Sequence, residues 1–221
     1  MRKIILASAS PRRKEILGKT GFDFEVRVSG CDENIKESLP DKLVMELSAL
    51  KAQDVARNEN QSIIIGSDTV VAHNGEILGK PKDVEDAKRM IRSFSGDKHQ
   101  VYTGVTLIVP NANKREADTV IKAAERTLPI VKEMSVSEND AENGTTYRIT
   151  YCVGTDVYVL PMTDEEIDRY VSTGEPMDKA GAYAIQGLFA PYIKGIVGDY
   201  YNVVGLPLCS LYSLIKPLME L

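Results

Sequence analysis

Two short apolar runs constrain the fold of this 221-residue chain more than any other feature. Residues 3–7 (Lys-Ile-Ile-Leu-Ala) and Ile63-Ile64-Ile65 each present consecutive apolar side chains followed by small residues, the pattern of buried strands. Segments with helical features lie between and after them, at about residues 11–19, 41–58, 83–95 and 163–172. Because strands and helices alternate while Asn74-Gly75 predicts a hairpin, we expect an α/β or α+β domain with a mixed sheet.

Other local signals complete this prediction. Ser10 is a suitable N-cap and Pro11 suits the first helical position, whereas Thr163 and Glu166 form a capping-box pattern. Further strands are predicted at residues 24–28, 101–109 and 147–160, and a last helix is predicted from about Pro207. All of these segments fit one domain that spans residues 1–221.

Residues 111–150 differ from the rest of the chain. Residues 111–113 are turn-like, residues 138–144 are polar and acidic, and a helix is predicted between them at 116–126. The apolar residues of this segment are too few for a core of its own. We therefore expect a surface excursion and not a second domain.

Composition excludes some classes of function. The net charge of −5 argues against broad nucleic-acid binding, which needs a basic face, although a local cluster of cations can still bind a small anion. The three cysteines, Cys31, Cys152 and Cys209, form neither a zinc motif nor a disulfide framework. No window approaches the roughly 20 apolar residues of a membrane span, and residues 1–7 do not resemble a signal peptide. We expect a cytoplasmic protein with no nucleic-acid or membrane partner.

The first motif with chemical potential is Ser8-Ala9-Ser10-Pro11-Arg12-Arg13, at a predicted strand-to-helix junction. A helix N-terminus offers unpaired N–H groups and a partial positive charge, and the two hydroxyls and two guanidinium groups add donors for phosphate oxygens. Considered alone, the motif is explained at least as well by a capped helix with two solvated arginines. It is therefore a phosphate-site candidate that needs support from elsewhere in the chain.

The second motif is Gly66-Ser67-Asp68-Thr69, predicted to follow the Ile63–Ile65 strand. A carboxylate at the end of a buried strand is a favoured catalytic location, so Asp68 is a candidate metal ligand or general base. The alternative is a side-chain cap that stabilises a turn. Glu33, predicted to lie at the end of another strand, is a second candidate oxygen ligand, although by itself it indicates only a surface acid.

Cations and one amide extend the candidate site. Lys80, beside Gly79 and Pro81, and Lys51, on the predicted 41–58 helix, could each place a positive charge near a polyphosphate. A solvated turn and a helix-dipole partner are the respective alternatives. Gln186 lies in the small-residue segment 178–187 and could pair with the edge of a nucleobase, although that segment could equally be a packing loop.

The absence of other motifs narrows the reaction class. The sequence has no Walker A motif and no G-x-S-x-G motif, and its two histidines, His73 and His99, lie far apart. We interpret both histidines as ordinary surface or strand residues. Acids, cations and hydroxyls remain, a set that best supports metal-assisted attack of water on phosphorus.

These motifs together resemble the Maf family of nucleotide pyrophosphatases. The resemblance covers nearly the whole chain and depends on five segments in register: residues 6–13, 66–71, 78–81, 178–187 and 202–207. It implies a mixed α/β fold of helices around a twisted sheet, with a cleft between two lobes. It also implies hydrolysis of a nucleoside triphosphate to the monophosphate and pyrophosphate with Mg²⁺ or Mn²⁺.

The resemblance further implies roles for individual positions. Asp68 matches the catalytic base and Glu33 an acid that helps to hold the metal. Phosphate-handling positions match Ser8, Arg12, Arg13, Lys51 and Lys80, and the positions of the branch that acts on dTTP and UTP match Arg12, Thr69 and Gln186. Family members are also linked to the removal of non-standard nucleotides and to inhibition of septum formation.

One departure from the family and two other functions stay open. Residues 111–150 lengthen a region that is compact in the family. If this segment packs near the cleft or a dimer face, it would alter substrate access and the oligomeric state, so both stay open. A nucleotide-binding regulator of cell division with little activity would bind the same phosphates. A nucleotidyltransferase would use the same acids, metal and triphosphate.

Overall fold

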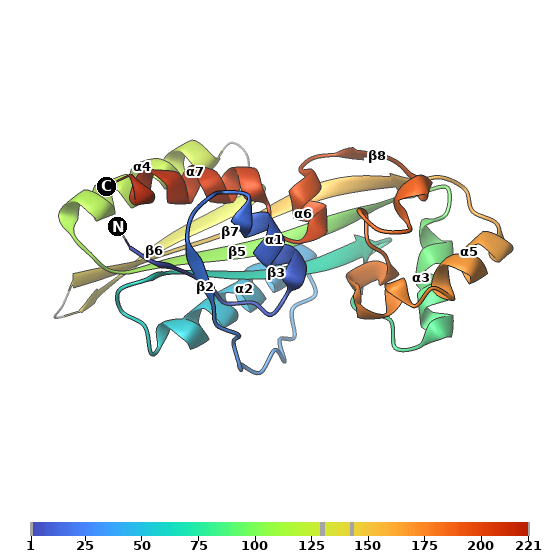
Figure 1. Ribbon diagram of the computed structural model, residues 1–221, viewed down its shortest axis with the longest axis horizontal. Helices are drawn as coiled ribbons and strands as arrows, with labels where there is room; N and C mark the ends of the chain where they lie inside the picture. The colour runs from blue at the N-terminus through green and yellow to red at the C-terminus, as the bar shows by residue number, and fades with distance from the viewer. Residues whose placement is uncertain (1, 129–130, 142–143, 221) are drawn as a thin grey trace.

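The computed structural model describes residues 2–128, 131–141 and 144–220 and contains one eight-stranded mixed sheet with helices on both faces (Figure 1). The strands are β1 (Ile4–Leu6), β2 (Phe24–Val26), β3 (Ile63–His73), β4 (Glu76–Leu78), β5 (Lys98–Ala112), β6 (Glu133–Ala141), β7 (Gly144–Val159) and β8 (Ile193–Val197). The helices are α1 (Pro11–Gly18), α2 (Pro40–Ala56), α3 (Val84–Phe94), α4 (Lys114–Thr127), α5 (Asp164–Val171), α6 (Tyr200–Val204) and α7 (Leu208–Met219). The expected mixed α/β class is confirmed.

Long strands run through the whole molecule, and short strands extend the sheet at its ends. The order is β2-β1-β3-β5-β7-β6, in which β1 is parallel to β2 and β3 and the remaining pairs are antiparallel. β4 pairs with the end of β3, and β8 pairs with the end of β7. β1 and β4 therefore lie along the same edge of β3, beside different stretches of that strand.

Helix α2 packs closely on one face of the sheet. Gly66 of β3 and Gly104 of β5 lie beneath it, and a Cβ atom on Gly104 would lie 2.1 Å from the Val44 carbonyl oxygen. Only glycine permits this approach of helix to strand. The opposite face carries α4 and α7 at one end and α3 and α5 at the other (Figure 1).

Two apolar clusters define two lobes on that opposite face. The first lobe packs side chains of the sheet, such as Leu107, against α4 and α7, including Val120 and Leu214. The second lobe packs the other end of the sheet against α3 and α5, with Phe94 and Ile167 fully or almost fully buried. Because burial of apolar area is the main stabilising term, each lobe holds its own end of the long strands in place.

The local signals in the sequence form the elements that they predict. The Ser10 side chain caps α1 by accepting from the Arg13 N–H, and Pro11 occupies the first turn. Thr163 and Glu166 form a capping box at α5. Asn74 and Gly75 both have positive φ in the two-residue turn between β3 and β4, as a type I′ hairpin requires.

Residues 111–150 contribute more to the core than expected. Val120, Ala123 and Ala124 of α4 are buried in the first lobe, as are Tyr147 and Ile149 of β7. The expectation of an excursion confined to the surface is therefore wrong, because this segment packs on the main sheet instead of needing a core of its own. Part of the acidic stretch 138–144, at residues 142–143, lies outside the described residues. That the segment is an addition to the family remains a prediction.

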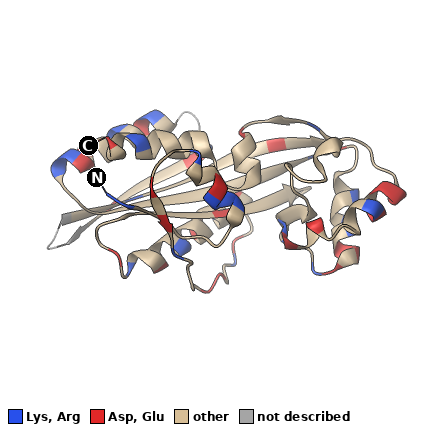
Figure 2. Ribbon diagram, in the orientation of Figure 1, with Lys and Arg blue, Asp and Glu red and all other residues tan. Residues whose placement is uncertain are grey.

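Charged side chains lie mainly on the outer helices and loops, with both signs mixed, while the long strands are largely uncharged (Figure 2). Among the described residues, no helix has the length and apolar content needed to cross a membrane.

Candidate active site

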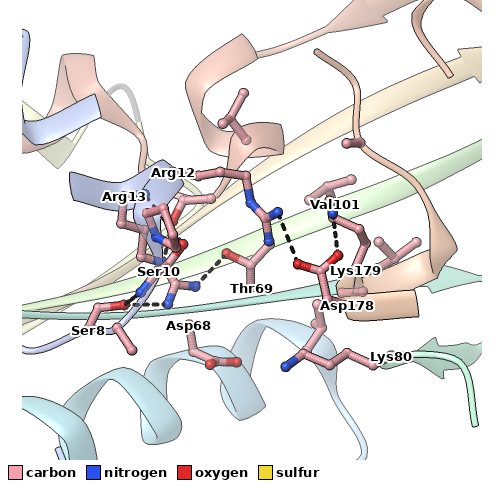
Figure 3. Close-up of a pocket in the computed structure, with 18 of the residues that line it drawn as sticks. Ser8, Ser10, Arg12, Arg13, Asp68, Thr69, Lys80, Val101, Asp178 and Lys179 are labelled. Carbon is pink, nitrogen blue, oxygen red and sulfur yellow. Dashed lines mark hydrogen bonds and ion pairs between the residues drawn. The ribbon is translucent and has the colours of Figure 1, made fainter. Parts of the chain in front are cut away.

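The site lies along one edge of β3. β1 pairs with Ile63–Ile65 and β4 with Val71–His73, so within the described part of the chain no strand pairs with residues 66–70 on that side. A cleft of about 610 Å³ lies beside this open edge (Figure 3). Asp68 was expected at the end of a strand but lies in the middle of β3, because pairing with β5 continues after β1 has ended.

The open edge lets both faces of the sheet contribute side chains to one cleft. Successive residues of a strand point to opposite faces. Asp68 points to the α2 side, where it meets Lys51, and Thr69 points to the α1 side, where it meets Arg13 (Figure 3). Two neighbouring residues can therefore line opposite parts of one ligand site.

On the α2 side, one lysine joins two carboxylates. The Lys51 ammonium donates to Asp68 Oδ1 at 2.6 Å and lies 3.0 Å from Glu33 Oε2. The side chains of Lys51 and Asp68 are only 12% and 15% exposed, whereas that of Glu33 is 54% exposed. The ion pair shows that Asp68 is not a turn cap. It also shows that Lys51 does more than interact with the helix dipole.

Glu33 reaches this cluster from a loop. The prediction that it ends a strand is wrong, because β2 ends at Val26 and residues 27–38 form no helix or strand. The side chain is nevertheless directed to Lys51. The loop thus supplies the more exposed carboxylate and β3 the more buried one.

On the α1 side, Arg13 is held by three bonds. Its Nε donates to the Gly205 carbonyl at 2.8 Å, and its two terminal nitrogens donate to Ser8 Oγ at 3.3 Å and to Thr69 Oγ1 at 3.1 Å. Burial lowers the pKa of Arg13, an effect that the nearby Asp68 charge opposes, and a guanidinium group stays protonated at any ordinary pH. Arg13 is therefore a fixed cation and not the solvated side chain that a simple capped helix would carry.

Polar groups behind Arg13 fix its acceptors. Thr69 Oγ1 lies 3.0 Å from Thr103 Oγ1, and Thr103 donates to the Asn202 carbonyl at 2.9 Å. The Asn202 amide in turn donates to the Val101 carbonyl and to Thr155. This network connects α6 to β5 and β7. Only the family resemblance marks residues 202–207 in the sequence, and no local signal predicts that their main chain holds Arg13.

The third wall comes from the second lobe. Arg12 forms an ion pair with Asp178 at 3.7 Å, and Asp178 also pairs with Lys179 (Figure 3). The hydrogen bond from Lys179 is the main cause of the lowered pKa of Asp178, and Arg12 adds to it. Lys80 and Gln186 are exposed side chains that line the same cleft. No local pattern in the sequence predicts the pairing of Asp178 with Arg12, because that contact depends on how the two lobes meet.

All the residues predicted for the site line this one cleft: Ser8, Ser10, Arg12, Arg13, Glu33, Lys51, Asp68, Thr69, Lys80 and Gln186. Arg13 lies with Ser8 and Thr69 on one side of the open strand edge, and the two carboxylates lie with Lys51 on the other. Such an arrangement can bind a polyanion and place a carboxylate beside it.

Comparison with known proteins identifies the family of this chain. The family model described as Maf-like protein matches residues 3–218. The chain belongs to the Maf family.

Relatives of this Maf protein match it over nearly the full length of both sequences. One from Lachnoclostridium phytofermentans is 45% identical over 217 residues, covering 98% of this chain and 95% of the relative. One from Agathobacter rectalis is 45% identical over 231 residues, covering 99% and 98%. One from Alkaliphilus metalliredigens is 46% identical over 213 residues, covering 96% and 93%. All three relatives are named dTTP/UTP pyrophosphatase.

Proposed function

We propose that this Maf protein hydrolyses dTTP and UTP to the monophosphate and pyrophosphate. The observation that carries the proposal is the Asp68–Lys51–Glu33 cluster directly across the open edge of β3 from Arg13. A protein that only bound phosphate would gain nothing from two acids in the same cleft. The names of the relatives support the reaction and the substrates.

The basic wall is suited to the triphosphate. Arg13 and the N-terminal turn of α1 offer fixed donors, and Arg12 and Lys80 can reach the cleft from either lobe. Because Arg13 is already oriented by Gly205, Ser8 and Thr69, it loses little freedom when an anion binds. In this proposal, these groups hold the phosphate chain and stabilise the leaving pyrophosphate.

The acidic wall fits a divalent cation. Among the described residues, no group of three or more His, Cys, Asp and Glu side chains could hold a metal by itself. Mg²⁺, however, is commonly held by one or two carboxylates together with substrate phosphates. The Lys51 ammonium already lies within 3.0 Å of both Asp68 and Glu33, so one cation can reach both carboxylates. Mg²⁺ or Mn²⁺ held there would neutralise phosphate charge and polarise the phosphorus centre.

Asp68 is the residue proposed to act on water. Its carboxylate takes a proton as the water oxygen attacks the α-phosphorus, and the bond from that phosphorus to the bridging oxygen breaks. Pyrophosphate leaves with its new charge facing the cations of the other wall. Lys51 keeps the Asp68 carboxylate oriented towards the cleft, and Glu33 would help to hold a bound cation.

Thr69, Gln186 and Arg12 are proposed to favour uracil and thymine, with Arg12 also close to the phosphates. Gln186 carries a donor and an acceptor and can pair with a base edge. We further infer a single domain over residues 1–221 that works in the cytoplasm with a nucleotide as its partner. Neither nucleic acid nor membrane is part of this proposal, and a homodimer is compatible with it.

Release of pyrophosphate from a panel of nucleoside triphosphates tests the function. Wild-type protein with Mg²⁺ or Mn²⁺ should convert dTTP and UTP to monophosphates in water alone, which a transferase or a regulator would not do. Asp68→Asn keeps the shape but removes the base and one ligand charge, so kcat should fall about 10²-fold or more. Near-normal turnover by Asp68→Asn would refute the role of Asp68 in hydrolysis. Equal rates on purine and pyrimidine triphosphates would refute the preference for dTTP and UTP.

A further inference from the structure

The Glu175 side chain connects the turn that carries Gln186 to the rest of the second lobe. Glu175 begins the 3₁₀ helix η2 (Glu175–Asp178), and both of its carboxylate oxygens lie 3.0 Å from the Leu188 N–H group. The Tyr170 hydroxyl on α5 donates to the same carboxylate at 3.0 Å. One carboxylate therefore joins a buried residue of α5 to the main chain two residues beyond Gln186.

Gly187 packs directly against the Glu175 carboxylate. A Cβ atom on Gly187 would lie 2.4 Å from a Glu175 carboxylate oxygen, so a side chain there would force the carboxylate to move. The Gly187 N–H also donates to the Ala184 carbonyl at 3.0 Å, which closes the turn around residues 185 and 186. The absence of a side chain at Gly187 lets the carboxylate reach Leu188, and the turn is fixed on both sides of Gln186.

A second main-chain bond holds the tip of the turn, because the Gly187 carbonyl accepts from the Ala190 N–H at 3.0 Å. Gln186 and Leu188 are exposed, and the buried neighbours Ile185 and Phe189 lie one residue further out on each side. Burial and the nearby Glu175 charge raise the pKa of the Tyr170 hydroxyl, so it stays a neutral donor to the carboxylate. The Tyr170 hydroxyl therefore remains a hydrogen-bond donor at the pH at which the protein would work.

We propose that Glu175 is a positioning residue for base selection: it fixes the main chain that presents Gln186 to the base. The inference rests on the proposed function, in which Gln186 contacts the base. Glu175 itself acts from behind the turn, on the Leu188 N–H. Its loss should therefore change the discrimination between bases that differ in hydrogen bonding, and not only the amount of folded protein.

The affinities of α,β-methylene UTP and α,β-methylene CTP test this inference without any need for hydrolysis. The two bases have the same size and differ at the edge that an amide would contact. Glu175→Ala should reduce the UTP-over-CTP affinity ratio about tenfold, the effect of losing one well-placed hydrogen bond. Glu175→Gln keeps an acceptor for Leu188 and should retain the ratio. Glu175→Asp is one methylene shorter and should lose this affinity ratio. It replaces Glu175→Ala as the test if the Ala variant does not fold.

Two comparisons separate positioning from stability. Glu165→Ala removes an exposed acid from α5 in the same lobe and should leave the ratio unchanged. In a Gln186→Ala background, Glu175→Ala should cause no further change of the ratio, because its effect passes through Gln186. Equal losses of affinity for both analogues, additive effects in the double variant, or no preference in the wild type would each overturn the inference. Failure of wild-type hydrolysis, by contrast, would refute the proposed function alone.

Discussion

Replacement of Lys51 by methionine probes the charge cluster most directly, because it removes the ammonium but keeps an apolar side chain of similar length. The Asp68 carboxylate, with a side chain only 15% exposed, would lose the partner that lies 2.6 Å away. It would also face Glu33 without an intervening positive charge. We expect Lys51→Met to lower the free energy of unfolding when no divalent cation is present.

The magnitude follows from the burial of the two ion pairs that Lys51 forms. The Glu33 side chain is mostly exposed, and exposed ion pairs contribute about 0–1 kcal/mol. The pair with Asp68 is more buried, so its contribution should lie between that value and the roughly 3–5 kcal/mol lost when a fully buried pair is broken. We expect a loss of about 2–3 kcal/mol in all, equivalent to about 5–10 °C in Tm for a chain of this size.

Thermal unfolding followed by circular dichroism measures this loss, since the chain has no tryptophan for fluorescence. Lys42→Met is the matched control, because Lys42 lies on the same helix and pairs with Glu133 but is 44% exposed. It should unfold close to the wild type. Mg²⁺ at about ten times its Kd should return about 1.4 kcal/mol to Lys51→Met, and less to the wild type, whose ammonium competes for the same carboxylates.

Two results would refute this reasoning. If Lys51→Met unfolds at the wild-type temperature without metal, the ion pair with Asp68 contributes no stability. If Mg²⁺ and Mn²⁺ stabilise the two proteins equally, the cation does not bind where the ammonium lies.

Three further predictions concern the supports of the cleft. Arg13→Lys should lose the forked contacts to Ser8 and Thr69 and raise KM for the triphosphate about tenfold or more, whereas equal KM values would contradict a phosphate role. Gly104→Ala should destabilise the protein by more than about 2 kcal/mol in urea unfolding, because its Cβ would meet the Val44 carbonyl, and an unchanged midpoint would contradict close packing of α2. Burial lowers the pKa of His99 from 6.5 to about 3, so only the unfolded chain gains its proton between these values and stability falls as pH drops below about 6.5. The wild type should lose about 3 kcal/mol by pH 4 that His99→Gln does not lose, and parallel pH curves would exclude this cause.

The sequence predicted best those features that depend on neighbours along the chain. The caps at Ser10 and Thr163 and the Asn74-Gly75 turn are set by bonds within a few residues, so the pattern alone identifies them. The phosphate and acid motifs were found for a similar reason, because Ser8 to Arg13 and Asp68 each lie in a short segment of unusual composition.

Features that depend on distant partners were missed. β6 carries Ser, Glu, Asn and Asp, which are poor strand formers, and it becomes a strand only because β7 offers a continuous edge. The two histidines were expected to be ordinary surface or strand residues, and both lie in strands but are buried, His99 completely. Glu33 and Asp178 reach the cleft through contacts with Lys51 and Arg12, which are far away in the sequence.

The open edge of β3 explains why this fold can hold acids and cations in one small cleft without neutralising all of them. In a fully paired strand, Asp68 and Thr69 would point to opposite faces and serve different environments. Here β1 ends before Gly66 and β4 begins only beside Val71, so a ligand at the edge can contact both side chains. Asp68 stays with Lys51 and Glu33 on the α2 side, while Arg13 is held 3.1 Å from Thr69 on the α1 side. The sheet itself separates the carboxylates from the guanidinium group, so the charges of opposite sign remain available to a substrate that carries phosphate and to the cation that accompanies it.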